Sequence, residues 1–202
     1  GKSDLVVRDI KIEGKTNLTD AIIKSGDEIT IDAESGNIGN ENSNSNIQYK
    51  WWWGSSENDR YQEIVDNNKN SISGEIATGN GLAPNGEEYE WVSETPFGNW
   101  DPDNWIVNLE PGTYWLTFEI DNPDGNAESD ETNNWRSEQF IVQDRFEGNN
   151  THASATDLTD EFGILKGEYN TLQQVSIHSS MDSDYYMFKT AGSGEVTVTI
   201  SD

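Results

Sequence analysis

The strongest constraint on the fold is the alternation of side chains along residues 114–120, YWLTFEI, where apolar Tyr, Leu, Phe and Ile positions alternate with Trp, Thr and Glu. A period of two is the pattern of a β-strand that buries one face and exposes the other. Pro111-Gly112 precedes this run, and Asn122-Pro123-Asp124-Gly125 follows it with proline and glycine where a type I turn prefers them. The sequence therefore predicts a strand bounded by turns.

Short segments with the same alternation recur along the chain, and glycine and asparagine separate them. They are residues 4–12, 27–34, 47–54, 61–65, 71–76, 88–92, 105–109 and 135–142. No helical periodicity extends over a useful length, so the chain is predicted to be all-β. Residues 35–46 read as a polar, turn-rich segment with little to bury, and residues 93–104 read as an inserted loop.

Composition excludes several classes of function. The chain of 202 residues carries a formal charge of −26, which argues against nucleic acid and anionic membrane surfaces as partners. Cations are the natural counterpart, although such acidity also keeps a secreted protein soluble in salt. The absence of cysteine excludes disulfides, thiolate catalysis and cysteine-ligated zinc. No apolar run approaches the roughly 20 residues of a membrane helix and no signal peptide is recognisable, so we expect a mature domain or an excised piece without membrane insertion.

Three stretches make residues 3–142 similar to a known family. They are the run from Pro111 through Asp121 to Glu131-Thr132-Asn133-Asn134, the opening residues 3–7 with the strand at 26–31, and the turn at 36–40. Together they resemble the bacterial cell-adhesion-related domain, CARDB. The resemblance implies an immunoglobulin-like β-sandwich of extracellular proteins, and it brings no catalytic residues with it.

A change in composition at Asp144 predicts a boundary between a domain over residues 1–142 and another over residues 143–202. Residues 144–202 resemble the start of the bacterial pre-peptidase C-terminal (PPC) domain through Asp144, Phe146, Glu147, Asn149, Asn150, Ala153, Ala155, Leu158 and residues 182–188. That family continues for several more strands. The resemblance therefore implies a second, incomplete, jelly-roll-like β-sandwich. Its missing part lies in another chain or was lost, or its strands complete a neighbour's sheet.

The first candidate calcium site lies at the start of the second domain and consists of Glu147, Asn149, Asn150, Asp182 and Asp184. Calcium prefers about six to eight oxygen ligands from carboxylates, amides and carbonyls, which these residues supply. In collagen-binding relatives of the PPC family the corresponding residues bind calcium, so the resemblance implies the same role here. The alternative is a cap in which these side chains hydrogen-bond to the backbone.

The second candidate calcium site is the loop after residue 120, which holds Asp121, Asp124, Glu128, Asp130 and Glu131. Five carboxylates in this short stretch repel one another unless water, salt or a cation screens them. Their spacing does not fit an EF-hand loop. The alternative is a structural role in which the acidic side chains tie the loop to the sheet.

Three tryptophans, Trp52, Trp115 and Trp135, are predicted to lie on one outer sheet face. Polar Gln48 and Lys50 set the facing of residues 47–54, so Trp52 points outward and Trp51 and Trp53 point into the core. In an immunoglobulin-like topology the three strands are neighbours. Such a face suits a packing protein domain or subunit, or a polysaccharide that stacks on the rings, unless the assigned facing is wrong.

Catalytic residues are not apparent in the sequence. His152 and His178 are the only imidazoles, and neither neighbours a nucleophile motif or a metal-binding histidine pair. The chain is therefore not expected to be an enzyme. Asn17-Leu18-Thr19 and Asn149-Asn150-Thr151 are glycosylation sequons, which an asparagine-rich chain also produces by chance.

These observations predict a non-catalytic, secreted or surface-displayed bacterial module that acts in adhesion or assembly and is stabilised by calcium. Two alternatives stay open. One is an accessory region that targets a secreted hydrolase or protease to polysaccharide or protein matrix. The other is a subunit of an extracellular filament.

Overall fold

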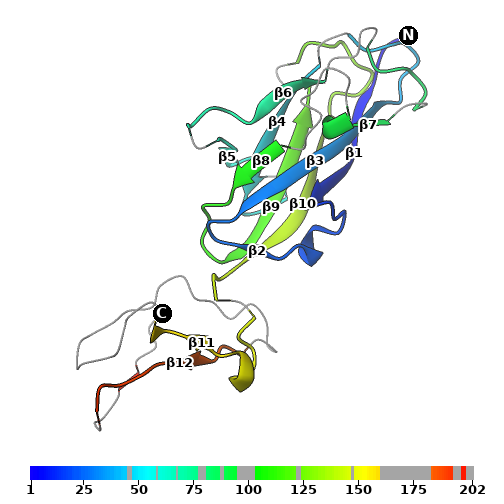
Figure 1. Ribbon diagram of the computed structural model, residues 1–202. Coiled ribbons are helices and arrows are strands. Elements are labelled where there is room, and N and C mark those ends of the chain that lie inside the picture. Colours follow the sequence, from blue (N-terminus) through cyan, green and yellow to red (C-terminus); the bar gives the residue numbers. More distant parts are fainter. Residues whose placement is uncertain are drawn as a thin grey trace. The chain divides into compact units, whose positions relative to one another are not determined.

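The computed structural model divides into two compact units, Gly1–Gln143 and Asp144–Asp202. It describes residues 1–44, 47–57, 59–66, 68–76, 81–86, 89–94, 103–121, 124–146, 148–159, 183–192 and 197–198. The division between the units falls next to the boundary expected from composition. The elements that lie wholly within the described residues are β-strands and three short 3-10 helices (Figure 1). The predicted all-β, immunoglobulin-like sandwich is confirmed.

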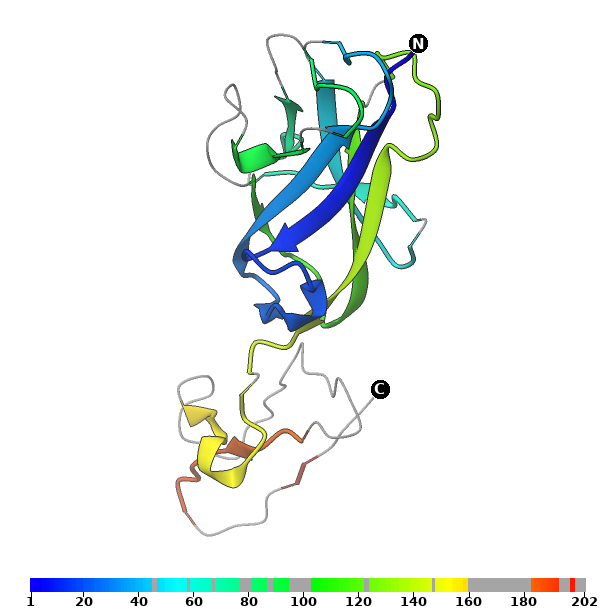
Figure 2. The same ribbon diagram turned by 90° about the vertical axis from the view of Figure 1, so that its right-hand side faces the viewer.

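The first sheet of unit 1 is built around β3 (Glu28–Asn37). On one side β3 pairs antiparallel with β1 (Leu5–Ile12). On the other side it pairs with β7 (Tyr89–Trp91) and β8 (Asp103–Ile106). β1 and β3 lie over the second sheet as a separate layer (Figure 2).

The second sheet runs in the order β2 (Ile23–Lys24), β10 (Trp135–Gln143), β9 (Gly112–Ile120), β4 (Ile47–Gly54) and β5 (Gln62–Glu63). A further strand, β6 (Ser73–Ile76), also pairs with β4. Strands β4, β9 and β10 are therefore antiparallel neighbours. This is the arrangement that the prediction about the outer tryptophans required.

Alternating side chains on the facing sides of the two sheets form the core. Leu116, Phe118 and Ile120 of β9 are buried, and Trp51 of β4 packs edge-on against Phe118 with ring centroids 4.7 Å apart. Trp53 is partly buried and packs against the same core. Aromatic rings of this size bury much apolar area each, which is how a chain with only 32% hydrophobic residues fills a two-layer core.

The prediction for residues 35–46 was wrong at its start, because β3 continues to Asn37 and both Ser35 and Asn37 are fully buried. Hydrogen bonding makes the burial of Asn37 possible, whereas the buried hydroxyl of Ser35 has no hydrogen-bond partner among the described residues. Asn37 Oδ1 accepts from the backbone N–H groups of Asp4 and Gly39, and Asn37 Nδ2 donates to the carbonyl of Leu82. A buried amide whose hydrogen bonds are satisfied carries little penalty, so a polar sequence can still be interior.

Two other elements differ from the predicted ones. β8 begins at Asp103, inside the loop predicted over 93–104, and the described chain also contains a 3-10 helix, η1 (Leu18–Asp20), followed by β2. β2 pairs in parallel with the end of β10 through two residue pairs only. A strand this short carries no periodicity, so its pairing depends on tertiary contacts.

Unit 2 has a small described part. It contains a 3-10 helix, η3 (His152–Ser154), which Thr151 caps, and β11 (Thr156–Asp157) in parallel pairing with β12 (Tyr186–Met187). Most of the remaining residues of this unit lie outside the described ranges. The predicted second β-sandwich therefore stays a prediction. None of the helices described in either unit is long and apolar enough to cross a membrane.

Candidate functional site

The loop that joins β9 to β10 starts at Asp121, whose backbone takes the left-handed conformation with φ 60°. Its carboxylate accepts three hydrogen bonds, from the N–H of Gly125 (3.1 Å), the N–H of Asn126 (2.9 Å) and Asn126 Nδ2 (2.9 Å). Asn126 Oδ1 in turn accepts from the N–H of Asn44 at 2.7 Å. Aspartate tolerates the left-handed region because its side chain bonds to nearby backbone groups. Asp121 thus fixes the direction in which the loop leaves the sheet.

Glu128, further along this loop, binds the N-terminal strand. Its Oε2 atom accepts from the N–H of Leu5 at 2.7 Å, and its carbonyl accepts from Lys2 Nζ at 3.2 Å. The next residue, Ser129, donates its N–H to the carbonyl of Ser3 at 3.0 Å. Asp4 adds two contacts, accepting from Ser129 Oγ and Asn133 Nδ2. The loop therefore holds the entry to β1.

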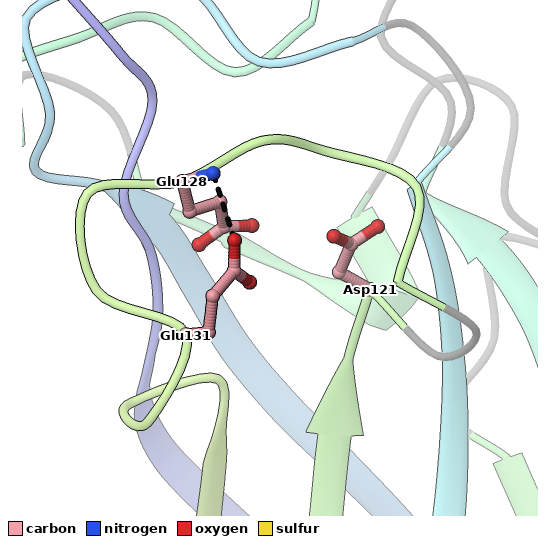
Figure 3. A group of neighbouring side chains, drawn as sticks. All are labelled: Asp121, Glu128 and Glu131. Carbon is pink, nitrogen blue, oxygen red and sulfur yellow. Dashed lines mark hydrogen bonds between the residues drawn. The ribbon is translucent and has the colours of Figure 1, made fainter.

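Three acidic side chains of the loop converge, with one carboxylate oxygen each from Asp121, Glu128 and Glu131 within 4.8 Å of one another (Figure 3). Asp121 and Glu128 are only 6% and 3% exposed, whereas Glu131 is exposed. Glu131 Oε1 also accepts from the N–H of Glu128 at 2.9 Å. We refer to these three residues as the carboxylate cluster. Oxygen atoms gathered in this way are the ligands that calcium prefers.

Burial and like charges change the ionisation of Glu128. Loss of hydration raises the pKa of its carboxyl to about 8, with Asp121, Glu131 and Asp4 adding to the rise and the Leu5 N–H opposing it. A carboxylate in this position is costly unless a proton or a cation offsets its charge. The cluster is therefore a place where a proton or a cation would stabilise the folded chain.

The other two acids predicted for this site, Asp124 and Asp130, are exposed and not in the cluster. Asp130 Oδ1 accepts from the hydroxyl and the N–H of Thr132, and these bonds lower the pKa of Asp130. Its role is to close a turn in the loop. The structure thus divides the five predicted acids into three that meet and two that face solvent.

The first candidate calcium site is only partly described, because Glu147 and Asp182 lie outside the described residues. Asn149 is 1% exposed and donates from Nδ2 to the carbonyl of Tyr185 at 3.4 Å. Asn149 Oδ1 has no hydrogen-bond partner among the described residues. Asn150 Oδ1 accepts from the N–H of Ser183, next to Asp184. This first candidate site stays a prediction.

The three outer tryptophans lie where they were predicted. The register places Trp52 opposite Thr117, and Trp135 opposite Glu119, so these residues share the outer face of the second sheet with Trp115. Each ring is half-buried, and Thr117 between them is fully buried. We refer to this surface as the tryptophan face.

Basic side chains of the same domain cover part of the tryptophan face. Arg60 forms a salt bridge with Glu119 and lies over the Trp135 ring at 5.5 Å, and Glu119 also accepts from Trp52 Nε1 at 3.0 Å. Lys50 lies 5.7 Å from the Trp52 ring centroid and pairs with a glutamate of β5. Two of the three rings therefore already have cation–π partners.

Sequence reasoning missed Asn126 and Arg60. Asn126 joins Asp121 to Asn44, 82 residues away along the chain, and Arg60 joins the segment before β5 to β9 and β10. In a chain with 12 basic and 38 acidic residues, an arginine beside the sheet is expected to meet a carboxylate. The sequence does not say which carboxylate, because the contact is formed between strands far apart in sequence.

Comparison with known proteins gives structural similarity alone. No protein-family model matches the chain, and no curated protein matches it. Among the solved structures that are similar to it are two of one domain. The crystal structure of the CARDB domain of the PF1109 protein from Pyrococcus furiosus, in complex with di-metal ions, aligns with a TM-score of 0.43 and 16% identity over 70% of this chain and 94% of that chain. The solution structure of the same domain aligns with a TM-score of 0.41 and 13% identity over 70% and 95%.

Proposed function

We propose that this chain is a non-catalytic extracellular bacterial module for adhesion or assembly, and that calcium stiffens one end of its sandwich. The observation that carries the proposal is the convergence of Asp121, Glu128 and Glu131 within 4.8 Å on a loop that also holds the N-terminal strand. A divalent cation there would join the end of β9, the start of β1 and the approach to β10. The sandwich would then present its surfaces rigidly to a partner.

The chemistry of the cluster suits calcium better than a softer metal. Its side chains offer only carboxylate oxygens, and the described cluster contains no imidazole. Backbone carbonyls and water would complete the roughly six to eight ligands that calcium takes. The same cation would offset the repulsion between the two buried carboxylates, which otherwise requires a proton on Glu128.

Thermal unfolding with calcium and with a chelator tests the proposal. Calcium at about 100 times its Kd should stabilise the fold by about 2.7 kcal/mol, which raises Tm by about 5 to 15 °C for a unit of this size. Asp121→Asn and Glu131→Gln should reduce this response. Asp124→Asn is the matched control, since Asp124 lies in the same loop outside the cluster and should leave the response unchanged. An equal Tm in millimolar calcium and in chelator would overturn the calcium proposal.

The partner-binding surface in this proposal is the tryptophan face. Arg60 and Lys50 occupy positions over Trp135 and Trp52, so a sugar ring that stacks there has to displace a cation. This favours a protein domain or subunit that packs across the face, with Trp115 as its apolar contact. Light scattering over a range of concentrations, on the wild type and on Trp115→Ala, tests self-assembly. A strictly monomeric wild type would exclude a second copy as the partner.

A targeting role is the alternative, in which the chain is an accessory region of a secreted hydrolase or protease. The resemblance of residues 144–202 to PPC domains supports it. A filament subunit is a weaker alternative. Pull-down on insoluble polysaccharide and on protein matrix separates targeting from assembly. Binding that is lost in Trp115→Ala would favour targeting through the tryptophan face.

A further inference from the structure

The two glycosylation sequons of the chain have opposite structural settings. Asn17 is exposed and stands immediately before η1, in extended backbone geometry with φ −87° and ψ 99°. Asn149 of the second sequon is 1% exposed, and its side-chain nitrogen donates to the carbonyl of Tyr185. A transferase needs access to the amide nitrogen of the acceptor asparagine, so in the folded chain only the first sequon presents it.

The local geometry around Asn17 leaves the acceptor nitrogen available. Thr19 Oγ1 donates to Asn17 Oδ1 at 3.0 Å, which orients the amide by its oxygen, and within the described residues Asn17 Nδ2 has no hydrogen-bond acceptor. Leu18, between them, is buried and anchors the turn in the core. By contrast, Thr151 of the second sequon is engaged in a capping box with Ser154.

We infer that Asn17 is an acceptor site for an N-linked glycan and that Asn149 is not. The reaction is the transfer of an oligosaccharide from a polyprenyl-diphosphate carrier. Asn17 Nδ2 forms a bond to the anomeric carbon, the bond from that carbon to the diphosphate oxygen breaks, and the amide nitrogen loses one proton to the transferase. The polyprenyl diphosphate leaves with the electron pair of the broken bond.

A glycan at Asn17 would lie away from the carboxylate cluster of unit 1. Residues 18–20 follow the end of β1, whereas the carboxylate cluster contacts the start of β1, so the sequon and the cluster lie at opposite ends of the strand (Figures 1 and 2). The glycan would cover one end of the sandwich and leave the carboxylate cluster accessible. In the cell the modification rests on the extracellular localisation proposed above.

Enzymatic transfer of an oligosaccharide to the purified, folded chain tests the site independently of where the protein is located in the cell. The chain is incubated with a single-subunit oligosaccharyltransferase that accepts Asn-x-Thr and with its lipid-linked oligosaccharide, and glycopeptides are assigned by mass spectrometry. The expected result is one glycan per chain at Asn17, lost in Asn17→Gln and in Thr19→Val and retained in Asn149→Gln.

Synthetic peptides of residues 13–21 and 145–153 are the control for sequence preference of the enzyme. Both peptides should be glycosylated, because neither is folded, whereas the intact chain should be modified at Asn17 alone. Modification of Asn149 at the same rate as Asn17 in the intact chain would overturn the inference. So would an unmodified chain in a reaction that glycosylates the peptide of residues 13–21.

Discussion

The acidic side chains of the carboxylate cluster and of the tryptophan face have opposite kinds of neighbour. In the cluster, Asp121, Glu128 and Glu131 meet other carboxylates, and the pKa of Glu128 rises to about 8 because of burial and like charge. On the tryptophan face Glu119 meets Arg60 and the indole N–H of Trp52. The negative charge of the carboxylate cluster would therefore be offset by a proton or a cation from solution. The negative charge of Glu119 is offset by a basic side chain of the same protein. Sensitivity to pH and calcium should belong to the first region only.

The largest expected effect is a loss of stability in chelator as pH rises from about 4.5 to about 8. Below its unfolded pKa, Glu128 is protonated in both states, and above that value the folded state retains a proton that the unfolded state releases. Each unit of pKa difference corresponds to about 1.4 kcal/mol, so the loss should amount to a few kcal/mol. Urea unfolding monitored by tryptophan fluorescence measures this loss of stability in unit 1, because all eight tryptophans lie within residues 51–135.

Glu128→Gln is the control for this prediction, since glutamine still accepts from the Leu5 N–H but carries no charge. The variant should be more stable than the wild type at about pH 8 in chelator and should have a flatter pH dependence. Burial also raises the pKa of Asp32 and of Asp103, so only the difference between variant and wild type reports on Glu128. Parallel pH curves for the two proteins would contradict the prediction.

A smaller effect is expected on the tryptophan face. Glu119→Ala removes the acceptor of both Arg60 and Trp52 Nε1 and should lower the free energy of unfolding by about 1 to 3 kcal/mol. Because the charges there are already matched, the loss should be the same in calcium and in chelator. A loss of stability that changes with calcium would mean that the two regions are coupled, and it would contradict the expectation that only the carboxylate cluster responds to calcium.

The smallest effect is expected for Arg60→Ala, which removes an exposed salt bridge and the cation over Trp135. The free energy of unfolding should fall by about 0.5 to 1.5 kcal/mol. Acrylamide should quench tryptophan fluorescence more strongly, because one half-buried ring becomes accessible. Arg8→Ala is the matched control, since its salt bridge with Glu34 lies on the other sheet. Unchanged quenching in Arg60→Ala would show that Arg60 does not cover the ring.

Sequence patterns predicted the strands of unit 1 well because a half-buried strand needs a period of two. β4 matches its predicted range, and the facing of Trp51 and Trp52 follows from the polar residues Gln48 and Lys50. The same reasoning failed at Asn37, where burial is possible only because distant backbone groups complete the hydrogen bonds. A local pattern contains no information about such partners.

The carboxylate cluster was only partly predictable for a similar reason. The density of acids identified the loop, but the turns that Asp121 and Asp130 close decide which carboxylates converge. Glu128 turns inward because its carboxylate accepts a hydrogen bond from the N–H of Leu5, which is 123 residues away in the sequence. Charge density thus located the region, while tertiary contacts selected three of its five acids.

The hold of Glu128 and Ser129 on Ser3 and Leu5 has a mechanical consequence. Tension applied to the N-terminus would load these hydrogen bonds, together with those that join Lys2 and Asp4 to residues 37–40, before it reached the longer ladder between β1 and β3. The force at which β1 peels away would then depend on the charge state of one glutamate. In the adhesive module proposed above, the ion concentration outside the cell would influence how firmly the first strand resists being pulled.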